Sequence, residues 1–204
     1  MQHFLRFFFR LLYHPFAFAY DLVAAVVSFG RWKDWTQAVI PFIEGTRILE
    51  LGHGPGHLQR ILSDLKFDPV AIDESAQMGR VAKRRLGKSG NLIRALAQQI
   101  PFAAESFDSV IATFPAEYIF DRQTLSEVQR VLRNRGRFIV LLAAWPESPL
   151  LAWLFKITGQ SPGGTYESIK SKTNEFLART KFSALDIEIV EVKSASLLIV
   201  IAKK

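Results

Sequence analysis

The sequence contains no cysteine among its 204 residues. This absence excludes a disulfide-bonded scaffold and every metal site built on thiolates, such as a structural zinc site. The four histidines do not stand with acidic residues at the spacing of metal ligands, so no metal site is expected. A chain without cysteine fits a reducing cytoplasm, and we expect the protein to be located there.

The sequence also lacks an uninterrupted hydrophobic run long enough to cross a membrane, which takes about 20 apolar residues. The Phe-rich first thirty residues come nearest, but charged residues and proline break every window of that length: Arg6, Arg10, His14, Pro15 and Asp21. Arg10 and His14 also interrupt the apolar region that a secretory signal peptide needs. We therefore expect neither a membrane span nor a signal peptide.

Residues 1–40 are expected to form a helical cap, and two interpretations of its first part remain open. In the first, residues 1–30 form a pair of helices packed on the main domain. In the second, residues 1–14 form an interfacial helix, with phenylalanines at the acyl boundary of a membrane and Arg6 and Arg10 at the headgroups. The second interpretation gives a peripheral location on the inner face of the membrane.

The rest of the chain, residues 41–204, reads as a single folded domain. The hydrophobic content of 49% and the alternation of strand and helix patterns argue against disorder. The formal net charge is +7, which suits nucleic acid, an anionic membrane or an acidic substrate, but also serves solubility alone. The charge therefore does not choose among these partners.

The most informative feature is a glycine-rich turn between a strand and a helix. Residues 47–51 read as a buried strand, and Gly52, Gly54 and Gly56 follow at alternate positions. Such a turn points free backbone N–H groups and a positive helix end at a ligand, and the missing side chains let that ligand come close. The spacing differs from the G-x-G-x-x-G of dinucleotide-binding folds. On its own, this turn suggests a nucleotide-type cofactor or only a tight connection.

Glu50, Gly52, Gly54 and Gly56 match, position by position, the E/D-x-G-x-G-x-G first motif of the class I S-adenosylmethionine-dependent methyltransferases, which the chain resembles. The resemblance implies an α/β, Rossmann-like, seven-stranded and mostly parallel sheet with helices on both faces, an antiparallel C-terminal hairpin and N-terminal helices. It implies S-adenosyl-L-methionine as cofactor and S-adenosyl-L-homocysteine as product, with cofactor contacts from these four residues and from His53.

Downstream residues extend the resemblance. Asp73 ends a short strand, where an acid accepts hydrogen bonds from ribose hydroxyls in nucleotide-binding units; a helix cap before Ser75 is the other interpretation. Residues 73–78 resemble the family's D-x-S-x-x-M continuation, which adds Glu74 and Met78 to the expected cofactor contacts.

The segment 97–102 resembles the family's D-A-x-x-L-P-F element beside the adenine, and it adds Ala97 and Gln98 to the expected contacts. Family members usually carry an acid before this alanine, which hydrogen-bonds the adenine amine, whereas this chain has Leu96. We therefore expect one polar contact fewer, unless Gln98 or backbone groups replace it.

The segment 107–113 reads as the fourth strand and ends at Phe114, on the rim where acceptors dock in this fold. Phe114 is counted among the cofactor contacts, and Tyr118 is a candidate on the substrate side. Tyr20 is a second candidate, because residues 20–30 look like the N-terminal helix of the ubiquinone/menaquinone C-methyltransferases. The N/D-P-P-Y/F signature of methylation on nucleic-acid amino groups is absent, which argues against nucleic acid as a partner.

The last third of the chain is expected to complete the sheet. Asp121 would cap a helix whose apolar face includes Leu132, and Gly136 would take the left-handed position in the turn that follows. A fifth strand is expected at residues 138–143, and the final strands at about 185–190 and 196–202. Between them we expect a substrate lid or a packed connection at 145–166 and a helix near 167–179.

Methyl transfer from a sulfonium needs no covalent residue, because the protein has only to orient donor and acceptor and to exclude water. No catalytic base and no oligomeric state are assigned from the sequence. Three functions stay open: methylation of a small lipophilic acceptor such as a quinone precursor or lipid, methylation of RNA or protein, and a non-catalytic cofactor-binding scaffold. The positive charge alone motivates the second function, and Leu96 with the altered turn at Asn134 and Arg135 motivates the third.

Overall fold

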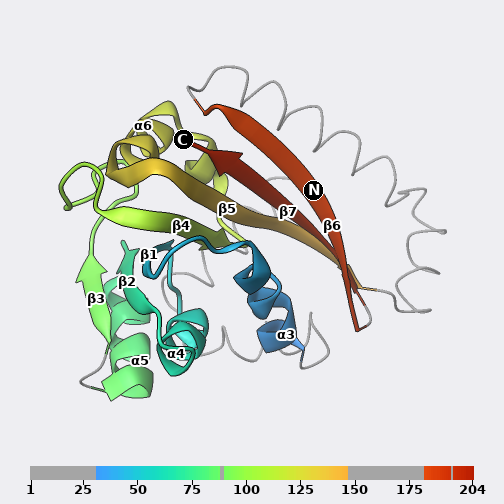
Figure 1. Ribbon diagram of the computed structural model, residues 1–204. Helices are drawn as coiled ribbons and strands as arrows, with labels where there is room; N and C mark the ends of the chain where they lie inside the picture. Colours follow the sequence, from blue (N-terminus) through green and yellow to red (C-terminus); the bar gives the residue numbers. More distant parts are fainter. Residues whose placement is uncertain (1–30, 88–89, 147–181, 194) are drawn as a thin grey trace.

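The computed structural model describes residues 31–87, 90–146, 182–193 and 195–204 (Figure 1). Tyr20, the N-terminal helices, most of the expected lid and the helix near 167–179 lie outside the described residues. No helix within the described ranges is long and apolar enough to cross a membrane.

The strands of the described residues form one seven-stranded sheet in the order β3-β2-β1-β4-β5-β7-β6. Strands β1 to β5 pair in parallel, and β7 runs antiparallel to both β5 and β6. This is the sheet that the sequence predicts. Its strands are β1 (Arg47–Leu51), β2 (Asp68–Asp73), β3 (Asn91–Arg94), β4 (Phe107–Thr113), β5 (Leu132–Pro146), β6 (Ala184–Val192) and β7 (Ala195–Lys203).

The strand order reverses between β1 and β4. From β1 the chain moves outward to β2 and β3, and it then returns to β4 on the other side of β1. In open α/β sheets, ligands bind at such a reversal, outside the carboxyl ends of the strands. The glycine-rich turn follows β1 at this point, so the topology positions it as a ligand site.

Helices cover both faces of the sheet (Figure 1). Residues of α6 pack in one apolar core with β1, β2 and β4, and residues of α3 and α4 pack in a second core on the opposite face. Neighbouring residues of β1 point to opposite faces, so Ile48 joins the second core and Leu49 the first. The helices are α3 (Trp32–Gln37), α4 (His57–Asp64), α5 (Ala76–Leu86) and α6 (Arg122–Val131), with 3-10 helices η2 (Ile40–Phe42) and η4 (Glu117–Phe120).

Helix α6 begins at the predicted cap, where the Asp121 side chain accepts a hydrogen bond from the Gln123 backbone N–H. The prediction that Leu132 lies on this helix is wrong. The helix ends at Val131, and Leu132 starts β5, where it pairs with Phe107 and is fully buried. Strand β5 is therefore much longer than the predicted 138–143.

The prediction that Gly136 takes the left-handed position is also wrong, because Arg135 does so, with φ of +66°. Glycine at 136 serves close packing instead. A Cβ atom there would lie 2.8 Å from the Arg133 carbonyl oxygen and 3.0 Å from that of Asp108. Arg135 is thus held in a left-handed conformation that glycine would adopt without strain.

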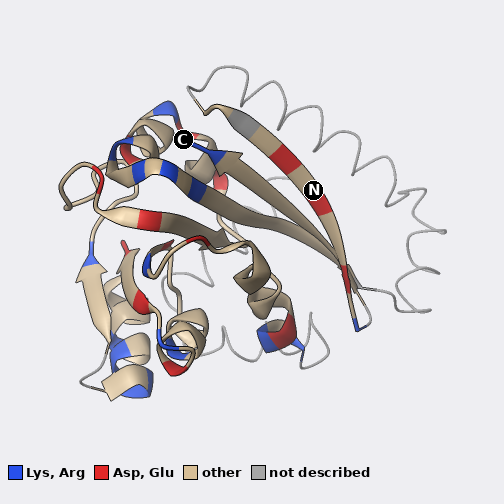
Figure 2. Ribbon diagram, viewed as in Figure 1, with Lys and Arg blue, Asp and Glu red and all other residues tan. Residues whose placement is uncertain are grey.

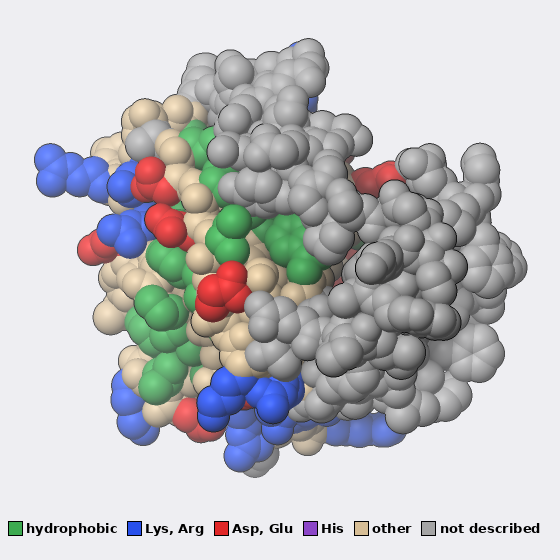
Figure 3. All heavy atoms as spheres, turned by 90° about the vertical axis from the view of Figure 1, so that its right-hand side faces the viewer, with side chains coloured by type: hydrophobic (Ala, Val, Ile, Leu, Met, Phe, Trp, Pro, Cys, Tyr) green, Lys and Arg blue, Asp and Glu red, His purple; other side chains and the backbone are tan. Residues whose placement is uncertain are grey.

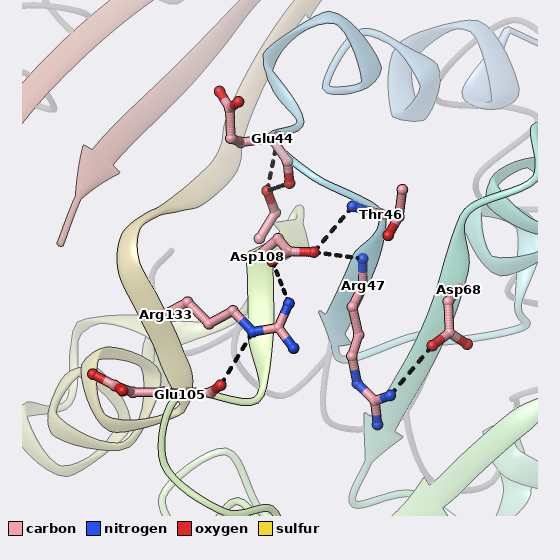
Figure 4. A network of polar contacts seen from close by, with 8 residues as sticks. Glu44, Thr46, Arg47, Asp68, Glu105, Asp108 and Arg133 are labelled. Carbon is pink, nitrogen blue, oxygen red and sulfur yellow. Dashed lines mark hydrogen bonds and ion pairs between the residues drawn. The ribbon is translucent and has the colours of Figure 1, made fainter.

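The amino ends of the strands are tied together by Asp108 of β4 (Figure 4). Its Oδ2 accepts hydrogen bonds from the backbone N–H groups of Thr46 (3.0 Å) and Arg47 (2.9 Å), and its Oδ1 accepts one from Arg133 Nη1 (2.6 Å). Burial raises the pKa of Asp108, but these hydrogen bonds outweigh burial and leave the pKa below its usual value. This network lies at the end of the sheet opposite to the glycine-rich turn.

Candidate cofactor site at the glycine-rich turn

The glycine-rich turn connects β1 to α4 and is fixed to the end of β2. The N–H groups of Gly52 and His53 both donate to the Ile72 carbonyl oxygen, at 2.8 and 3.3 Å. Gly52, Gly54 and Gly56 have φ angles of +72°, +50° and +81°. Side chains strongly disfavour this left-handed region, so the three glycines are required by backbone geometry.

The three glycines have different surroundings. A Cβ atom on Gly52 would lie 2.6 Å from Tyr118 Oη, and one on Gly56 would lie 3.0 Å from the Cβ of Ala82 in α5. Among the described residues, no atom lies within 4 Å of the corresponding position at Gly54. Gly52 and Gly56 therefore make room for the protein itself, whereas the open side of Gly54 is where a ligand can approach the backbone.

Asp73 links the end of β2 to both neighbouring turns. Its Oδ2 accepts a hydrogen bond from the Gly54 N–H (2.9 Å) and its Oδ1 accepts one from the Ser75 N–H (2.8 Å). The helix cap itself is Ser75, whose hydroxyl accepts from the Met78 N–H at 3.3 Å. A carboxylate offers about four acceptor sites, so Asp73 can still accept hydrogen bonds from ribose hydroxyls. Asp73 therefore stabilises the two turns, and the predicted contact with ribose hydroxyls stays a prediction.

Glu74 and Met78, the other predicted residues of this segment, differ in environment. Glu74 is exposed, and its backbone carbonyl accepts a hydrogen bond from Arg94 Nε (3.0 Å). Met78, in the first turn of α5, is fully buried. Among the basic residues of this helix, Lys83 and Arg84 are exposed, whereas Arg85 Nη1 donates a hydrogen bond to the Pro55 carbonyl oxygen at 2.6 Å and stabilises the glycine-rich turn.

Glu50 lies on the buried side of the turn, with 2% of its surface exposed. Its Oε2 accepts a hydrogen bond from Gln59 Nε2 of α4 at 2.8 Å. Burial raises the pKa of Glu50 to about 8; the Gln59 hydrogen bond lowers it, and the charge of Asp73 raises it further. Within the described residues, no ion pair joins Glu50 to a lysine or arginine, so this acid is suited to a cationic ligand.

His53 stabilises the turn from inside rather than facing outward. It is 5% exposed, and its Nδ1 lies 2.7 Å from the Gly54 carbonyl oxygen. Gln59, the partner of Glu50, was not among the predicted residues. Its signal in the sequence is a polar residue on the inward face of α4, beside buried Leu58 and Leu62.

The loop after β3 carries the residues that the resemblance assigns to the adenine side. Ala97 is buried, and Gln98 Nε2 lies 3.4 Å from Asp121 Oδ2 at the cap of α6. Leu96, which stands where the family usually has an acid, is 49% exposed. The structure thus engages Gln98 with a carboxylate of the protein.

The E-x-x-R pair of α6, Glu127 and Arg130, holds this loop in place. Arg130 donates to the carbonyl oxygens of Ile100 (2.9 Å) and Phe102 (2.6 Å), and Glu127 Oε2 accepts from the Ile100 N–H (2.8 Å). The two side chains also bond to each other at 2.7 Å. The motif therefore positions the loop that contains Ala97, a role that the sequence alone did not reveal.

Two predicted residues come from the end of β4 and from η4. Phe114 has a φ of +48°, and its N–H donates to the Leu141 carbonyl oxygen at 2.8 Å. The Tyr118 hydroxyl lies 3.4 Å from the Leu51 carbonyl oxygen, directly beside Gly52. The structure therefore brings Tyr118 to the glycine-rich turn, together with Glu50 and Asp73.

Comparison with known proteins gives one family. Residues 49–140 match the family described as a methyltransferase domain. A demethylmenaquinone methyltransferase of Thermotoga maritima is 32% identical over 136 residues, which cover 64% of this chain and 59% of that relative. The ubiquinone/menaquinone biosynthesis C-methyltransferase UbiE of Sinorhizobium fredii is 32% identical over 193 residues, which cover 80% of this chain and 75% of the relative.

Solved structures share the fold at lower sequence identity. Phosphoethanolamine N-methyltransferase 2 of Haemonchus contortus, in complex with S-adenosyl-L-methionine, gives a TM-score of 0.66 at 16% identity and covers 96% of this chain and 59% of its own. A SAM-dependent methyltransferase of Archaeoglobus fulgidus gives a TM-score of 0.60 at 16% identity, with 91% of this chain and all of the other covered.

The strand order and the open glycine-rich turn at its reversal define an α/β protein with a nucleotide-type cofactor site. With a 32% identical relative covered over three quarters of its length, the chain belongs to the family of S-adenosylmethionine-dependent methyltransferases. The predicted fold and family are thereby confirmed. S-adenosyl-L-methionine is the cofactor of this family.

Proposed function

We propose that this protein transfers a methyl group from S-adenosyl-L-methionine to a small lipophilic acceptor of the quinone-precursor type. The observation that carries the donor site is the open side of Gly54, whose N–H is held by Asp73. The names of the relatives, a demethylmenaquinone methyltransferase and a ubiquinone/menaquinone C-methyltransferase, support the class of acceptor.

The residues present fit this donor. Two vicinal ribose hydroxyls match the two oxygens of Asp73, and the open backbone at Gly54 lets the ligand approach closely. Ala97 and Gln98 line the side assigned to the adenine. The amino group of the donor would give Glu50 the positive charge that the described residues do not supply, and this charge would lower the pKa of the buried acid.

When bound, the donor supplies a methyl carbon whose bond electrons leave with sulfur, while the acceptor atom forms the new bond and releases its proton to solvent. The chain itself has to bind the donor and the acceptor, to orient them relative to each other and to exclude water from the site. In this proposal the glycine-rich turn and Asp73 would bind the donor, and Tyr118, whose hydroxyl lies close to Gly52, would face the acceptor. We assign no catalytic base.

The proposal includes a location on the cytoplasmic face of the membrane. A lipophilic quinone precursor is concentrated in the bilayer, and residues 1–14 combine phenylalanines with Arg6 and Arg10 in the pattern of an interfacial helix. In this arrangement residues 1–40 act as a cap over the domain formed by residues 41–204. Vesicle sedimentation of the full chain, compared with a chain lacking residues 1–14, tests the membrane contact.

The acceptor is tested by transfer of a labelled methyl group from S-adenosyl-L-methionine to a prenylated naphthoquinol in vesicles, with a water-soluble catechol as the comparison. We expect label on the naphthoquinol, dependent on vesicles, and its loss in Asp73→Ala. Asp68→Ala changes the exposed first residue of the same strand, β2, and should retain transfer. Equal transfer to the catechol by a chain lacking residues 1–14 would contradict the lipophilic acceptor.

A further inference from the structure

An aromatic cluster of Trp32, Trp35 and Phe114 stands at the same edge of the sheet as the glycine-rich turn, and of its rings only Phe114 is among the expected donor contacts. The rings of Trp32 and Phe114 are 4.6 Å apart between centroids and tilted by 33°, which is close to offset stacking. Trp35 lies behind both, 6.3 Å from each, and is 2% exposed. Trp32 and Phe114 are only partly buried. Trp35 is therefore part of the core, and the other two rings are at its edge.

The backbone of Phe114 is held in an unfavourable conformation. Its φ of +48° lies in the left-handed region, which is uncommon for a bulky side chain and tends to occur at functional sites. The hydrogen bond from its N–H to the Leu141 carbonyl oxygen ties this conformation to β5. The sheet thus fixes the position from which the Phe114 ring meets Trp32.

Phe114 and the donor turn lie at the same edge of the sheet. Strands β1 and β4 are parallel neighbours. The turn begins directly after Leu51, the last residue of β1, and Phe114 directly follows Thr113, the last residue of β4. A methyl acceptor must come within about 3–3.5 Å of the methyl carbon in the reactive geometry, so it has to bind against the residues that border this turn.

Other partly buried apolar side chains pack against the same core as the two rings. Ala144 of β5 and Val190 and Val192 of β6 pack against the same core, because β5, β6 and β7 extend beyond the ends of the central strands. In the space-filling view, hydrophobic side chains reach the surface, with acidic side chains among them and a group of lysine and arginine side chains below (Figure 3). Indole, phenyl and aliphatic groups suit a flat hydrocarbon ring better than a phosphate headgroup.

We infer that Trp32 and Phe114 form the surface on which a planar aromatic ring of the methyl acceptor stacks, with Trp35 as its buried support. This inference rests on the proposed function, because it concerns the acceptor of the same reaction. It assigns a binding role to Trp32, which the sequence does not distinguish from a packing residue.

The test is a calorimetric titration of 1,4-naphthoquinone into the full chain saturated with S-adenosylhomocysteine. Trp32→Ala should weaken naphthoquinone binding by about tenfold, and Trp32→Phe, which keeps a ring, should stay within about threefold of the native protein. Leu65→Ala removes another exposed apolar side chain, 52% exposed at the end of α4, and should change nothing. The affinity for S-adenosylhomocysteine should be the same in all four proteins.

Three outcomes would overturn the inference: no naphthoquinone binding by the native protein, equal effects of Trp32→Ala and Leu65→Ala, or equal loss in Trp32→Ala and Trp32→Phe. Loss of both ligands in Trp32→Ala, together with a lower melting temperature, would also overturn it by showing a structural role. Failure of the proposed function looks different, because the native protein would then not bind S-adenosylhomocysteine.

Discussion

At the scale of single residues, the buried carboxyl of Glu50 connects the site to stability. Its pKa is about 8 in the folded protein against 4.5 when unperturbed, so the native state binds more protons than the unfolded state between these values. The free energy of unfolding therefore falls as pH rises from about 4.5 to about 8. Burial of Glu50 in the folded protein therefore lowers the free energy of unfolding near neutral pH. A bound cation would reduce this loss of stability.

We predict that Glu50→Gln removes this pH dependence, because an amide can accept the Gln59 hydrogen bond without being charged. The free energy of unfolding, measured in urea at pH 5 and pH 8.5, should rise in the variant relative to the native protein by about a few kcal/mol from the lower to the higher pH. Glu188→Gln, on the exposed edge strand β6, is the control and should follow the native curve. The same pH slope in Glu50→Gln would show that another group controls it.

The contact between Gly52 and Tyr118 allows a second test at this scale. Gly52→Ala should destabilise the protein for two reasons, the positive φ and the Tyr118 hydroxyl 2.6 Å from the new Cβ. Tyr118→Phe removes only the hydroxyl, so the double variant should be more stable than the sum of the single effects by about 0.5–1 kcal/mol. Thermal and urea unfolding of the four proteins measure this coupling. Additive effects would mean that Tyr118 does not occupy the space above Gly52.

At the scale of elements, the two ends of the strands differ in role: one end forms the ligand site and the other a structural network. The carboxyl ends carry the glycine-rich turn, Asp73 and Phe114, whereas Asp108 ties the amino ends of β1, β4 and β5 together (Figure 4). The ligand site and the structural anchor are thus separated by the length of the strands, so changes at the anchor should affect stability and leave the donor site intact.

Asp108→Asn is therefore expected to lower stability by about 1–3 kcal/mol at pH 7 without changing donor affinity. The pKa of Asp108 is below its usual value, so its contribution is present at neutral pH and is lost as pH falls through that pKa. The difference between native and variant proteins should accordingly shrink in acid. Asp68→Asn breaks the exposed pair with Arg47 and should cost less than 1 kcal/mol in urea unfolding. Weaker S-adenosylhomocysteine binding by Asp108→Asn would contradict the separation of the two ends.

Local patterns in the sequence were sufficient for much of this architecture. Strand β4, the Asp121 cap and the glycine-rich turn depend on residues close in sequence, and the structure has them where expected. Contacts between distant segments were not readable: Gln59 with Glu50, Tyr118 with Gly52 and Trp32 with Phe114. The exchange of roles between Arg135 and Gly136 was missed because it depends on how tightly β5 approaches β4, which no local pattern encodes.

At the scale of the whole molecule, charge is distributed unevenly. Lysine and arginine residues occur at the far end of α5 and in the first part of β5, and acidic residues occur along the edge strand β6 (Figure 2). Several of the cations are paired, such as Arg133 with Asp108 and Arg137 with Glu44. The positive net charge is therefore partly engaged in structural contacts, which weakens the argument from charge for nucleic acid as a substrate.

The central claim is that the donor binds over the open side of Gly54. Calorimetric titration of S-adenosylhomocysteine into three proteins tests it most directly: the native chain, Gly54→Arg and Gly87→Arg. Gly87 is a matched control, because it also has a positive φ, +63°, and no described residue places an atom within 4 Å of a Cβ there, but it lies at the far end of α5. We predict that Gly54→Arg weakens binding by about a hundredfold or more, whereas Gly87→Arg binds like the native protein. No binding by the native chain, or equal affinity in the two variants, would contradict the account.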